Sequence, residues 1–275
     1  MNAKVIFLGT GGGRHTTMFQ ARSTGGFIID TGTRIHVDPG PGALTSMCLI
    51  KYNPENTDAV IISHCHPDHY SDAEVVIEGM SKGGWVHRGE VYGSVTVMEG
   101  QDGLGPCISE YHKKIPNKCC TIRAGDTYDI AGIRTEIMVA DHNDPTNVGF
   151  KFHTKDGVLT YVSDTAYSDA IADQYVGSRV LILPVTTPNE NRIKGHLCTV
   201  DAKRFIERVK PELAIFIHLG IVMLKHNPAT QAAMVEKATG IRTIAGEDFM
   251  ALNLKDLTID HLIPSKPDWN EDWEL

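Results

Sequence analysis

The chain has 275 residues, of which 41% are hydrophobic and 22% are charged, the composition of an ordinary globular protein. Its formal net charge of −8 argues against a chain-wide cationic surface for nucleic acid or an anionic membrane. No apolar stretch approaches the roughly 18 uninterrupted residues of a membrane span, and the chain opens on a strand-like segment without a charged leader. We expect a soluble, cytoplasmic protein folded as one domain over residues 1–275, without a membrane partner.

The six cysteines are irregularly spaced and include no C-x-x-C pair, so neither a disulfide framework nor a zinc ribbon is predicted. We expect reduced thiols. The adjacent Cys119 and Cys120 are the pair to consider for metal binding or oxidation, a role that requires exposure.

Apolar segments rich in β-branched residues recur along the chain with turn signals between them, a pattern that predicts strands. In chain order these segments are 5–8, 27–29, 35–37, 59–62, 91–97, 133–139, 148–152, 158–162, 180–185 and 213–217. The tripeptides DTG at 30–32 and KDG at 155–157 predict hairpin turns.

Helical signals are fewer and well separated. Ser71 and Glu74 have the spacing of a capping box and predict a helix to about residue 79. Thr199 is the predicted cap of a second helix, which Pro211 ends, and a third helix over 229–240 ends on a glycine. Strands come first and alternate with helices later, which predicts mixed sheets covered by helices.

Two segments are expected to be additions to this core. Residues 81–123 are rich in glycine and carry six basic against four acidic residues, a local charge of +2. We expect them to form an insertion that acts as a lid or as the rim of a substrate site. The tail at 262–275 is acidic and carries Trp269 and Trp273. It is expected to pack on a neighbouring element or on a partner chain, which is compatible with a homodimer.

The segment SHCHPDHYSD, residues 63–72, follows the predicted strand at 59–62. Because alternate residues of an extended chain point the same way, His64, His66 and Asp68 can line one side, while His69 turns into the next helix. A polar loop rich in histidine is the alternative interpretation. Three more candidate ligands come directly after predicted strands, and these are His142, Asp164 and His218. Strand ends gather along one edge of a sheet, so the whole set predicts a metal site.

The block H-x-H-x-D-H with a later His, Asp and His resembles the metallo-β-lactamase superfamily, from FLGTGGG to FIHLG. The resemblance implies an αββα four-layer sandwich of two mixed β-sheets flanked by helices. It also implies two groups of metal ligands joined by a bridging aspartate: His64, His66 and His142 for one metal, Asp68, His69 and His218 for the other, and Asp164 between them. VDPG at 37–40 matches the early aspartate of the family, so Asp38 would orient a ligand histidine.

Imidazole and carboxylate ligands without thiolate are typical of catalytic zinc, and manganese or iron would also be accommodated. We therefore expect two divalent ions, with zinc as the first choice. Two aspartates and a bridging hydroxide would leave about one positive charge at such a centre, which favours an anionic substrate.

Residues 195–220 resemble the ribonuclease Z and phosphodiesterase branch of the superfamily. This resemblance implies that His196 is not a ligand but donates a proton to the leaving group, while Asp68 also steers the metal-bridging hydroxide. The expected function is a dinuclear phosphodiesterase for a small-molecule or short single-stranded phosphodiester. Only 21 residues separate His142 from Asp164, so the tRNA-gripping arm of ribonuclease Z is missing and tRNA is a doubtful substrate.

The segment GTGGGRH at 9–15 could bring backbone N–H groups and Arg14 or His15 near a phosphate, although it matches neither nucleotide-binding glycine motif. A plain turn is the alternative. Two other functions stay open, an acyl hydrolase of the same fold acting on a lactone, thioester or β-lactam, and a metal-binding scaffold without turnover. An amidohydrolase barrel is disfavoured by the β-rich opening and by the Asp68-His69 pair.

Overall fold

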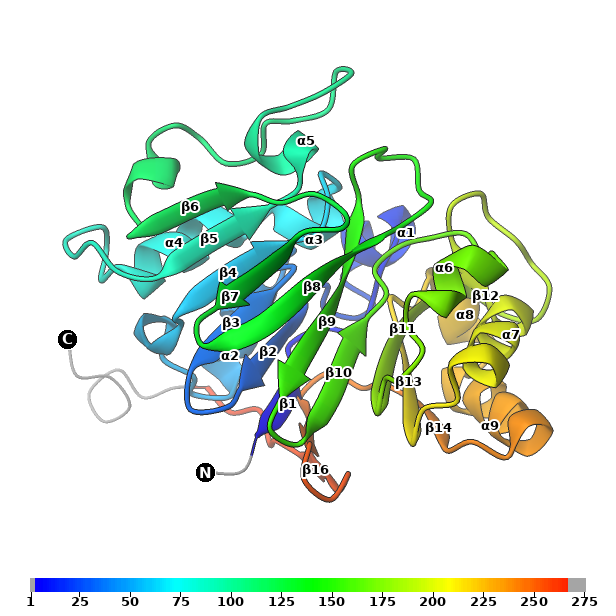
Figure 1. Cartoon of the computed structure of the whole chain (residues 1–275). Helices are drawn as coiled ribbons and strands as arrows, with labels where there is room; N and C mark the ends of the chain where they lie inside the picture. Colours follow the sequence, from blue (N-terminus) through cyan, green and yellow to red (C-terminus); the bar gives the residue numbers. More distant parts are fainter. Residues whose placement is uncertain (1–2, 267–275) are drawn as a thin grey trace.

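Two β-sheets form the centre of the structure, a computed structural model that describes residues 3–266 (Figure 1). The strands of the first sheet are β1 (Lys4–Phe7), β2 (Phe27–Asp30), β3 (Arg34–Val37), β4 (Ala59–Ile62), β5 (Glu90–Gly93), β6 (Lys118–Thr121), β15 (Met250–Asn253) and β16 (Ile259–His261). Their order is β16-β15-β1-β2-β3-β4-β5-β6. The pairs from β3 to β6 are parallel and the others antiparallel, so the sheet is mixed.

The second sheet is also mixed. Its strands are β7 (Thr127–Ile130), β8 (Ile133–Val139), β9 (Val148–Thr154), β10 (Gly157–Tyr161), β11 (Val180–Thr187), β12 (Leu197–Cys198), β13 (Leu213–Ile217) and β14 (Thr243–Ala245). The order is β14-β13-β11-β10-β9-β8-β7, with β12 beside β11. Strands β10, β11 and β13 run parallel, and β8 runs in the same direction because two antiparallel pairs separate it from β10. Their carboxyl ends therefore meet at one edge.

Aromatic and branched side chains fill the space between the sheets. Phe7 and Phe27 of the first sheet and Phe150, Phe152 and Tyr161 of the second are buried in one continuous apolar cluster. Within it the Phe27 and Tyr161 rings meet edge to face, with centroids 5.2 Å apart. Burial of this apolar surface is the main stabilising contribution to such a fold.

Helices cover the outer faces of both sheets (Figure 1). On the first sheet lie α2 (Ala43–Leu49) and α4 (Ala73–Met80), and on the second lie α6 (Asp169–Asp173), α7 (Thr199–Val209), α8 (Ile221–Lys225) and α9 (Pro228–Thr239). Shorter helical segments are α1 (Arg14–Phe19), α3 (Pro67–Tyr70), α5 (Val95–Met98) and the 3-10 turns Pro54–Asn56 and His112–Lys114. The αββα sandwich of two mixed sheets predicted from the sequence is therefore confirmed.

Both predicted hairpins are present, at the β2–β3 turn and at the β9–β10 turn. The predicted strand at 91–97 is wrong in its second half, because the chain leaves the sheet after Gly93 and forms α5. Thr96 within α5 donates its hydroxyl to Asp144 at 2.5 Å. This tertiary contact outweighs the β-propensity of the valines around it.

The two predicted helix caps are not formed, although the helices are. Helix α4 begins at Ala73 without a side-chain cap, since Ser71 donates its hydroxyl to the Pro67 carbonyl and Glu74 accepts from the Ser109 amide. Helix α7 begins at Thr199 itself, and the Thr199 hydroxyl donates to another side chain instead. The predicted end of α9 is confirmed, with Gly240 in the left-handed conformation at φ 70°.

Residues 81–123, predicted to be an addition to the core, supply β5 and β6 at one edge of the first sheet. The prediction that this segment lies outside the core is therefore wrong for these two strands. Trp269 and Trp273 of the predicted tail lie outside the described residues. Among residues 3–266, no helix combines the length and the apolar composition needed to cross a bilayer.

His36 on β3 should make the fold sensitive to acid. Its Nε2 donates to the Gly25 carbonyl at 2.8 Å, while its buried Nδ1 has no partner. Burial lowers the pKa of His36 from its ordinary 6.5 to about 4, although Gly25 and Asp38 oppose the shift. The unfolded chain thus binds the proton more readily, and stability falls as the pH drops from 6.5 to 4, by up to about 3 kcal/mol.

Urea unfolding at several pH values measures this loss. A His36→Gln variant keeps a donor for Gly25 and should lose less stability between pH 7 and pH 4 than the wild-type chain. The matched control is His226→Gln, which replaces an exposed histidine and should leave the pH dependence unchanged. An identical pH dependence in His36→Gln and wild type would contradict the prediction.

Candidate metal centre

The carboxyl ends of strands from both sheets deliver the predicted ligands to one place. His64 follows β4, His142 follows β8, Asp164 follows β10 and His218 follows β13. Within the described residues, ligand atoms lie within 4.8 Å of one another in three groups: His64, His66, His142 and Asp164; Asp68, His69 and His218; and Asp164, His196 and His218. All seven side chains predicted as ligands are thus brought together, and His196 lies beside them.

Local backbone geometry explains how a single short segment supplies four of these side chains. His66 precedes Pro67 and is extended, with φ −105° and ψ 139°, as expected for a residue before proline. Pro67 then occupies the first turn of α3, where its missing N–H costs nothing. The extended part presents His64 and His66, and the following helical turn presents Asp68 and His69 of the second group.

Three non-glycine residues around the centre have left-handed backbone. Asp38, Ser163 and His218 have φ values of 51°, 59° and 54°, a conformation that costs about 1–3 kcal/mol per residue. At His218 the flanking backbone is fixed, because Leu219 N–H donates to Thr10 at 2.9 Å. Such strain concentrates at functional sites, and here it aims the ring of His218 into the centre.

Four of the five predicted ligand histidines have one ring nitrogen engaged by the surrounding protein. The Nδ1 atoms of four rings have the following partners: Ser63 Oγ for His64 at 2.9 Å, Asp38 Oδ2 for His69 at 2.9 Å, the Gly195 carbonyl for His142 at 2.8 Å, and Thr186 Oγ1 for His218 at 3.0 Å. A carbonyl and a carboxylate only accept, so Nδ1 carries the proton in His142 and His69. Nε2 of both rings faces the centre, and its lone pair becomes available to a metal once Nε2 is deprotonated.

The inner ring nitrogens converge on common points. His66 Nδ1 lies 3.0 Å from His64 Nε2 and 3.1 Å from His142 Nε2. His69 Nε2 and Asp164 Oδ1 are buried without any hydrogen-bond partner. Buried polar atoms are nearly always satisfied, so lone pairs left facing one another fit a bound cation. The residues present therefore suit divalent metal ions.

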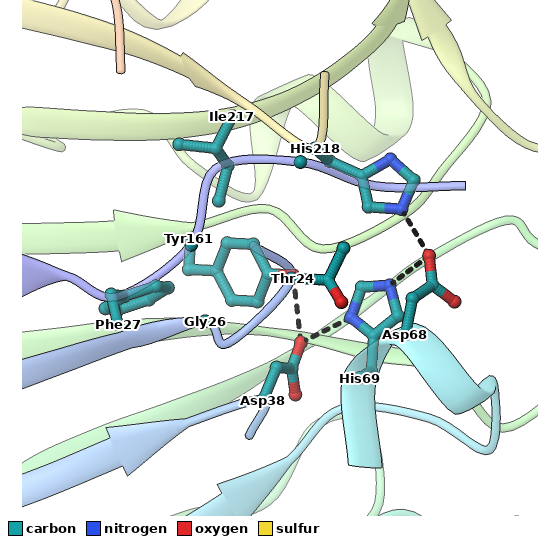
Figure 2. Close-up of a pocket in the computed structure, with 11 residues that line it drawn as sticks. Thr24, Gly26, Phe27, Asp38, Asp68, His69, Tyr161, Ile217 and His218 are labelled. Atoms are coloured by element: carbon teal, nitrogen blue, oxygen red, sulfur yellow. Dashed lines mark hydrogen bonds and ion pairs between the residues drawn. The ribbon is translucent and has the colours of Figure 1, made fainter. Parts of the chain in front are cut away.

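Asp164 lies between the groups of ligands and is buried. Its Oδ2 lies 3.1 Å from His218 Nε2, 3.5 Å from His69 Nε2, 3.5 Å from His196 Nδ1, 3.9 Å from His142 Nε2 and 4.0 Å from His64 Nε2. Asp68 lies beside the two histidines of its group, with Oδ2 3.2 Å from His218 Nε2 and 3.8 Å from His69 Nε2 (Figure 2). A carboxylate in the position of Asp164 can be shared by two cations.

The aspartates and histidines of the centre shift one another's pKa values. Burial alone would raise the pKa of Asp68 and Asp164, but the neighbouring histidines hold both below their usual range. Burial would lower the pKa of His69, yet these two aspartates raise it well above the ordinary value. Burial and the adjacent imidazoles lower the pKa of His64 and His66, so both are neutral and able to act as ligands.

The match to known proteins agrees with this geometry. The sequence model of the Beta-lactamase superfamily domain matches residues 33–219. The chain belongs to this superfamily. The uncharacterized protein MJ1374 of Methanocaldococcus jannaschii is 38% identical, over 89% of this chain and 92% of that protein. Ribonuclease Z of Pyrococcus furiosus is 32% identical over 111 residues, which are 40% of this chain and 33% of that enzyme.

Solved structures of other proteins share the fold. The metallo-β-lactamase fold protein YhfI of Bacillus subtilis has a TM-score of 0.76 at 17% identity, covering 91% of this chain and 99% of that one. Human tRNase Z, short form, has a TM-score of 0.68 at 16% identity and covers 91% and 99%. The fold is thus the metallo-β-lactamase fold, which is that of a family of metal-dependent hydrolases.

Asp38 forms hydrogen bonds beneath the histidines of the centre and lies below His69 in Figure 2. Its carboxylate accepts from Ser63 N and Oγ at 2.7 Å, from His69 Nδ1 at 2.9 Å and from Tyr161 Oη at 2.9 Å. The predicted partner of a ligand histidine therefore contacts His69 directly. Tyr161 was not recognised from the sequence, because it lies within an apolar strand pattern that only indicated core.

Asp144 is a second supporting residue that the sequence did not reveal. It is buried, and its Oδ2 accepts from Cys65 N at 2.9 Å and from Thr96 at 2.5 Å. Its Oδ1 accepts from Thr146 N at 2.8 Å. The β8–β9 loop is thereby tied to the loop that carries His64 and His66. An Asp-Pro-Thr turn was the available signal, but it does not say which distant groups the carboxylate meets.

Replacing Asp38 with asparagine should weaken metal binding by roughly 10–100-fold, the usual effect of losing a partner of a ligand histidine. His69 Nδ1 would lose its charged acceptor, so its ring orientation and basicity would both change. Competition of the metal-loaded protein with a chelator measures the affinity. Tyr161→Phe removes one of the four hydrogen bonds and should have a smaller effect, whereas unchanged affinity in Asp38→Asn would contradict the prediction.

A cavity of about 490 Å³ opens above the centre. Its walls are Gly13, Arg14, His15, His66, Pro67, Asp68, Asn143, Asp164, Thr186, Ile193 and His196. None of these residues comes from 81–123, the segment predicted as the substrate rim. The rim is instead built by the 9–15 segment, by Asn143 and by the loop after β11, which carries Ile193. No sequence signal pointed to Asn143 or Ile193.

The glycines at 12 and 13 lie directly against the centre. Gly13 N–H donates to Asp68 Oδ2 at 2.8 Å, and a Cβ added at Gly12 would lie 2.1 Å from the His218 ring. No side chain fits at Gly12 without displacing His218. The segment GTGGGRH therefore contacts the candidate ligands through Gly12 and Gly13, whereas its contact with a phosphate stays a prediction.

His196 lines the cavity next to the ligands. Its Nδ1 lies 3.3 Å from Thr186 Oγ1 and 3.5 Å from Asp164 Oδ2. Burial lowers the pKa of His196 to about 4, with Asp164 opposing the shift. With Nδ1 directed to these two side chains, Nε2 is the nitrogen left for a bound molecule.

Proposed function

We propose that the chain is a dinuclear metal-dependent phosphodiesterase. The observation that carries this proposal is the convergence of five histidine ring nitrogens from both groups on Asp164, beside a cavity whose wall also holds a histidine outside the predicted ligand set. In the proposed assignment His64, His66 and His142 bind one ion, Asp68, His69 and His218 bind the other, and Asp164 is shared. The donor set suits zinc, with manganese or iron as alternatives.

When bound, two divalent ions at such a centre supply an activated water and neutralise charge on the attacking and leaving oxygens of a phosphodiester. The protein residues do the remaining work. Asp38 and Thr186 fix the rings of His69 and His218 through Nδ1. Asp68, held by the N–H of Gly13 at 2.8 Å, is placed to orient the attacking oxygen.

His196 is proposed as the residue that acts on the leaving group. Its Nδ1 is directed to Thr186 and Asp164, which leaves Nε2 to hydrogen-bond the leaving oxygen. The proton donor is the imidazolium form, whose charge Asp164 favours: it gives its Nε2 proton to the leaving oxygen as the P–O bond breaks and becomes neutral. This assignment agrees with its place in the cavity wall.

The size of the site favours a small-molecule or short single-stranded phosphodiester. A cavity of about 490 Å³ lies within the range of small-molecule pockets, roughly 300–1,000 Å³. The chain between His142 and Asp164 consists mainly of β9, β10 and their tight turn, so it offers no arm for tRNA. Two proteins of the same fold are a diphosphatase of the PhnP family and yeast PDE1, with TM-scores of 0.66 and 0.69. Their names are consistent with chemistry at a phosphate.

A substrate screen of the metal-loaded protein tests the proposal. We expect cleavage of bis-p-nitrophenyl phosphate and no comparable cleavage of a lactone, a thioester or a β-lactam. Cleavage of one of the acyl substrates without any phosphodiester cleavage would make the chain an acyl hydrolase. Two bound metals with no activity on any substrate would instead indicate a metal-binding scaffold.

A further inference from the structure

A smaller hollow of about 150 Å³ adjoins the cavity above the centre. Its walls are Gly12, Gly13, Arg14, His15, Thr16, Thr186, Thr187, Ile193, Gly220, Ile221 and Val222. Five of these residues, Gly13, Arg14, His15, Thr186 and Ile193, also line the larger cavity. The two spaces therefore share a wall, and a ligand bound at the centre can extend from one into the other.

The hollow is lined mainly by apolar side chains and glycine backbone. Ile193 is 48% exposed and Val222 is 37% exposed, although both line a concave surface. No acidic side chain is among the described residues of its wall. Unpartnered apolar side chains in a concavity indicate a ligand site. An apolar cavity of about 150 Å³ is known to accept a benzene ring, so the space matches one ring.

The positively charged residue Arg14 lies where the hollow meets the larger cavity. Arg14 lines both spaces, its side chain is exposed, and it forms no ion pair or hydrogen bond with the part of the chain that the structure describes. A guanidinium binds phosphate oxygens well. In a chain with a net charge of −8, an unpaired arginine beside the proposed phosphate position favours an anionic ligand there.

We infer that this hollow binds a ring attached to the scissile phosphate, so that the substrate is a phosphodiester bearing a nucleobase-sized or aryl group. Ile193 and Val222 contact the ring, and Arg14 contacts the phosphate oxygens. The inference rests on the proposed function for the position of the phosphate. Ile193 and Val222 are thus the residues that determine specificity, whereas the metal ligands serve every phosphodiester alike.

Binding of two phosphonates to the metal-loaded protein tests the ring site without turnover. Isothermal titration calorimetry should give phenylphosphonate an affinity at least about tenfold higher than methylphosphonate, since only the former fills the hollow. Ile193→Asp and Val222→Asp should remove this preference, and Arg14→Gln should weaken both phosphonates alike. The matched control is Val176→Asp, which alters a 52% exposed valine outside both spaces and should change nothing. Equal affinities of the two phosphonates in the wild-type protein would overturn the inference.

Kinetics separate this inference from the proposed function. Bis-p-nitrophenyl phosphate and methyl p-nitrophenyl phosphate share a leaving group and differ in the second substituent, so the ring site predicts a KM at least about fivefold lower for the former. Cleavage of both esters with equal KM would overturn the ring site and leave the phosphodiesterase intact. A preference for phenylphosphonate without cleavage of either ester would support the ring site and contradict the phosphodiesterase.

Discussion

Replacing Asp164 with asparagine should strip the purified protein of both metal ions and lower phosphodiester cleavage by more than about a hundredfold. Its Oδ2 faces both groups of ligands, from 3.1 Å at His218 to 4.0 Å at His64, so an amide of the same shape removes a negative charge from both ions at once. Loss of a residue that only supports a ligand costs about 10–100-fold, and loss of a shared ligand should exceed it.

Metal content by mass spectrometry and cleavage of bis-p-nitrophenyl phosphate give the two readouts for Asp164→Asn. Asp260→Asn is the matched control, because Asp260 is exposed on β16 and should keep wild-type metal content and activity. Two ions retained by Asp164→Asn would show that the aspartate is not a shared ligand. A variant that unfolds is recognised by circular dichroism, and Asp164→Glu, which keeps the charge, should then retain at least one ion.

Replacing His196 with alanine should keep both metal ions but lower the rate for esters with a poor leaving group by about 10²–10⁴-fold. The proposed role is to protonate the leaving oxygen, so the effect should depend on the leaving group. An ester of p-nitrophenol, whose anion leaves without a proton, should be much less affected than an ester of a simple alcohol. The comparison requires kcat for both esters together with metal analysis.

Metal content decides between two roles for His196. Its ring also lies within 4.8 Å of ligand atoms of Asp164 and His218, a possible third group. Loss of an ion in His196→Ala would make it a ligand and contradict the proton-donor role. His15→Ala is the matched control in the same cavity wall, and any effect it has should be equal for both leaving groups.

The sequence predicted the strands and the ligands from local patterns. Each of the four strand-end ligands follows an apolar run, and the direction of a strand is enough to place its end at a shared edge. His66 and His69 could be placed for a similar reason. The alternation of side-chain direction before Pro67 and the helical turn after it depend only on neighbouring residues. The division of these side chains into two groups came instead from the resemblance to the metallo-β-lactamase superfamily.

The predictions from the sequence were wrong where a side chain could form its contact with one of several partners. Ser71 and Glu74 had the spacing of a capping box, but Glu74 accepts from Ser109, 35 positions away. Residues 91–97 had the composition of a strand, yet Thr96 joins Asp144 across 48 positions. In both cases the local preference is weaker than the tertiary contact that replaces it.

What the sequence determined by itself is the set of candidate ligands and the mixed sheets covered by helices, because periodicity and ligand spacing are local. Only the tertiary structure decided the supports of the centre and the shape of the site. Tyr161 reaches Asp38 across 123 positions, and Asp144 reaches Cys65 across 79. The ring hollow likewise combines glycines from one end of the chain with Ile193 and Val222. Pairings over such separations depend on how the two sheets stack, and no local pattern encodes them.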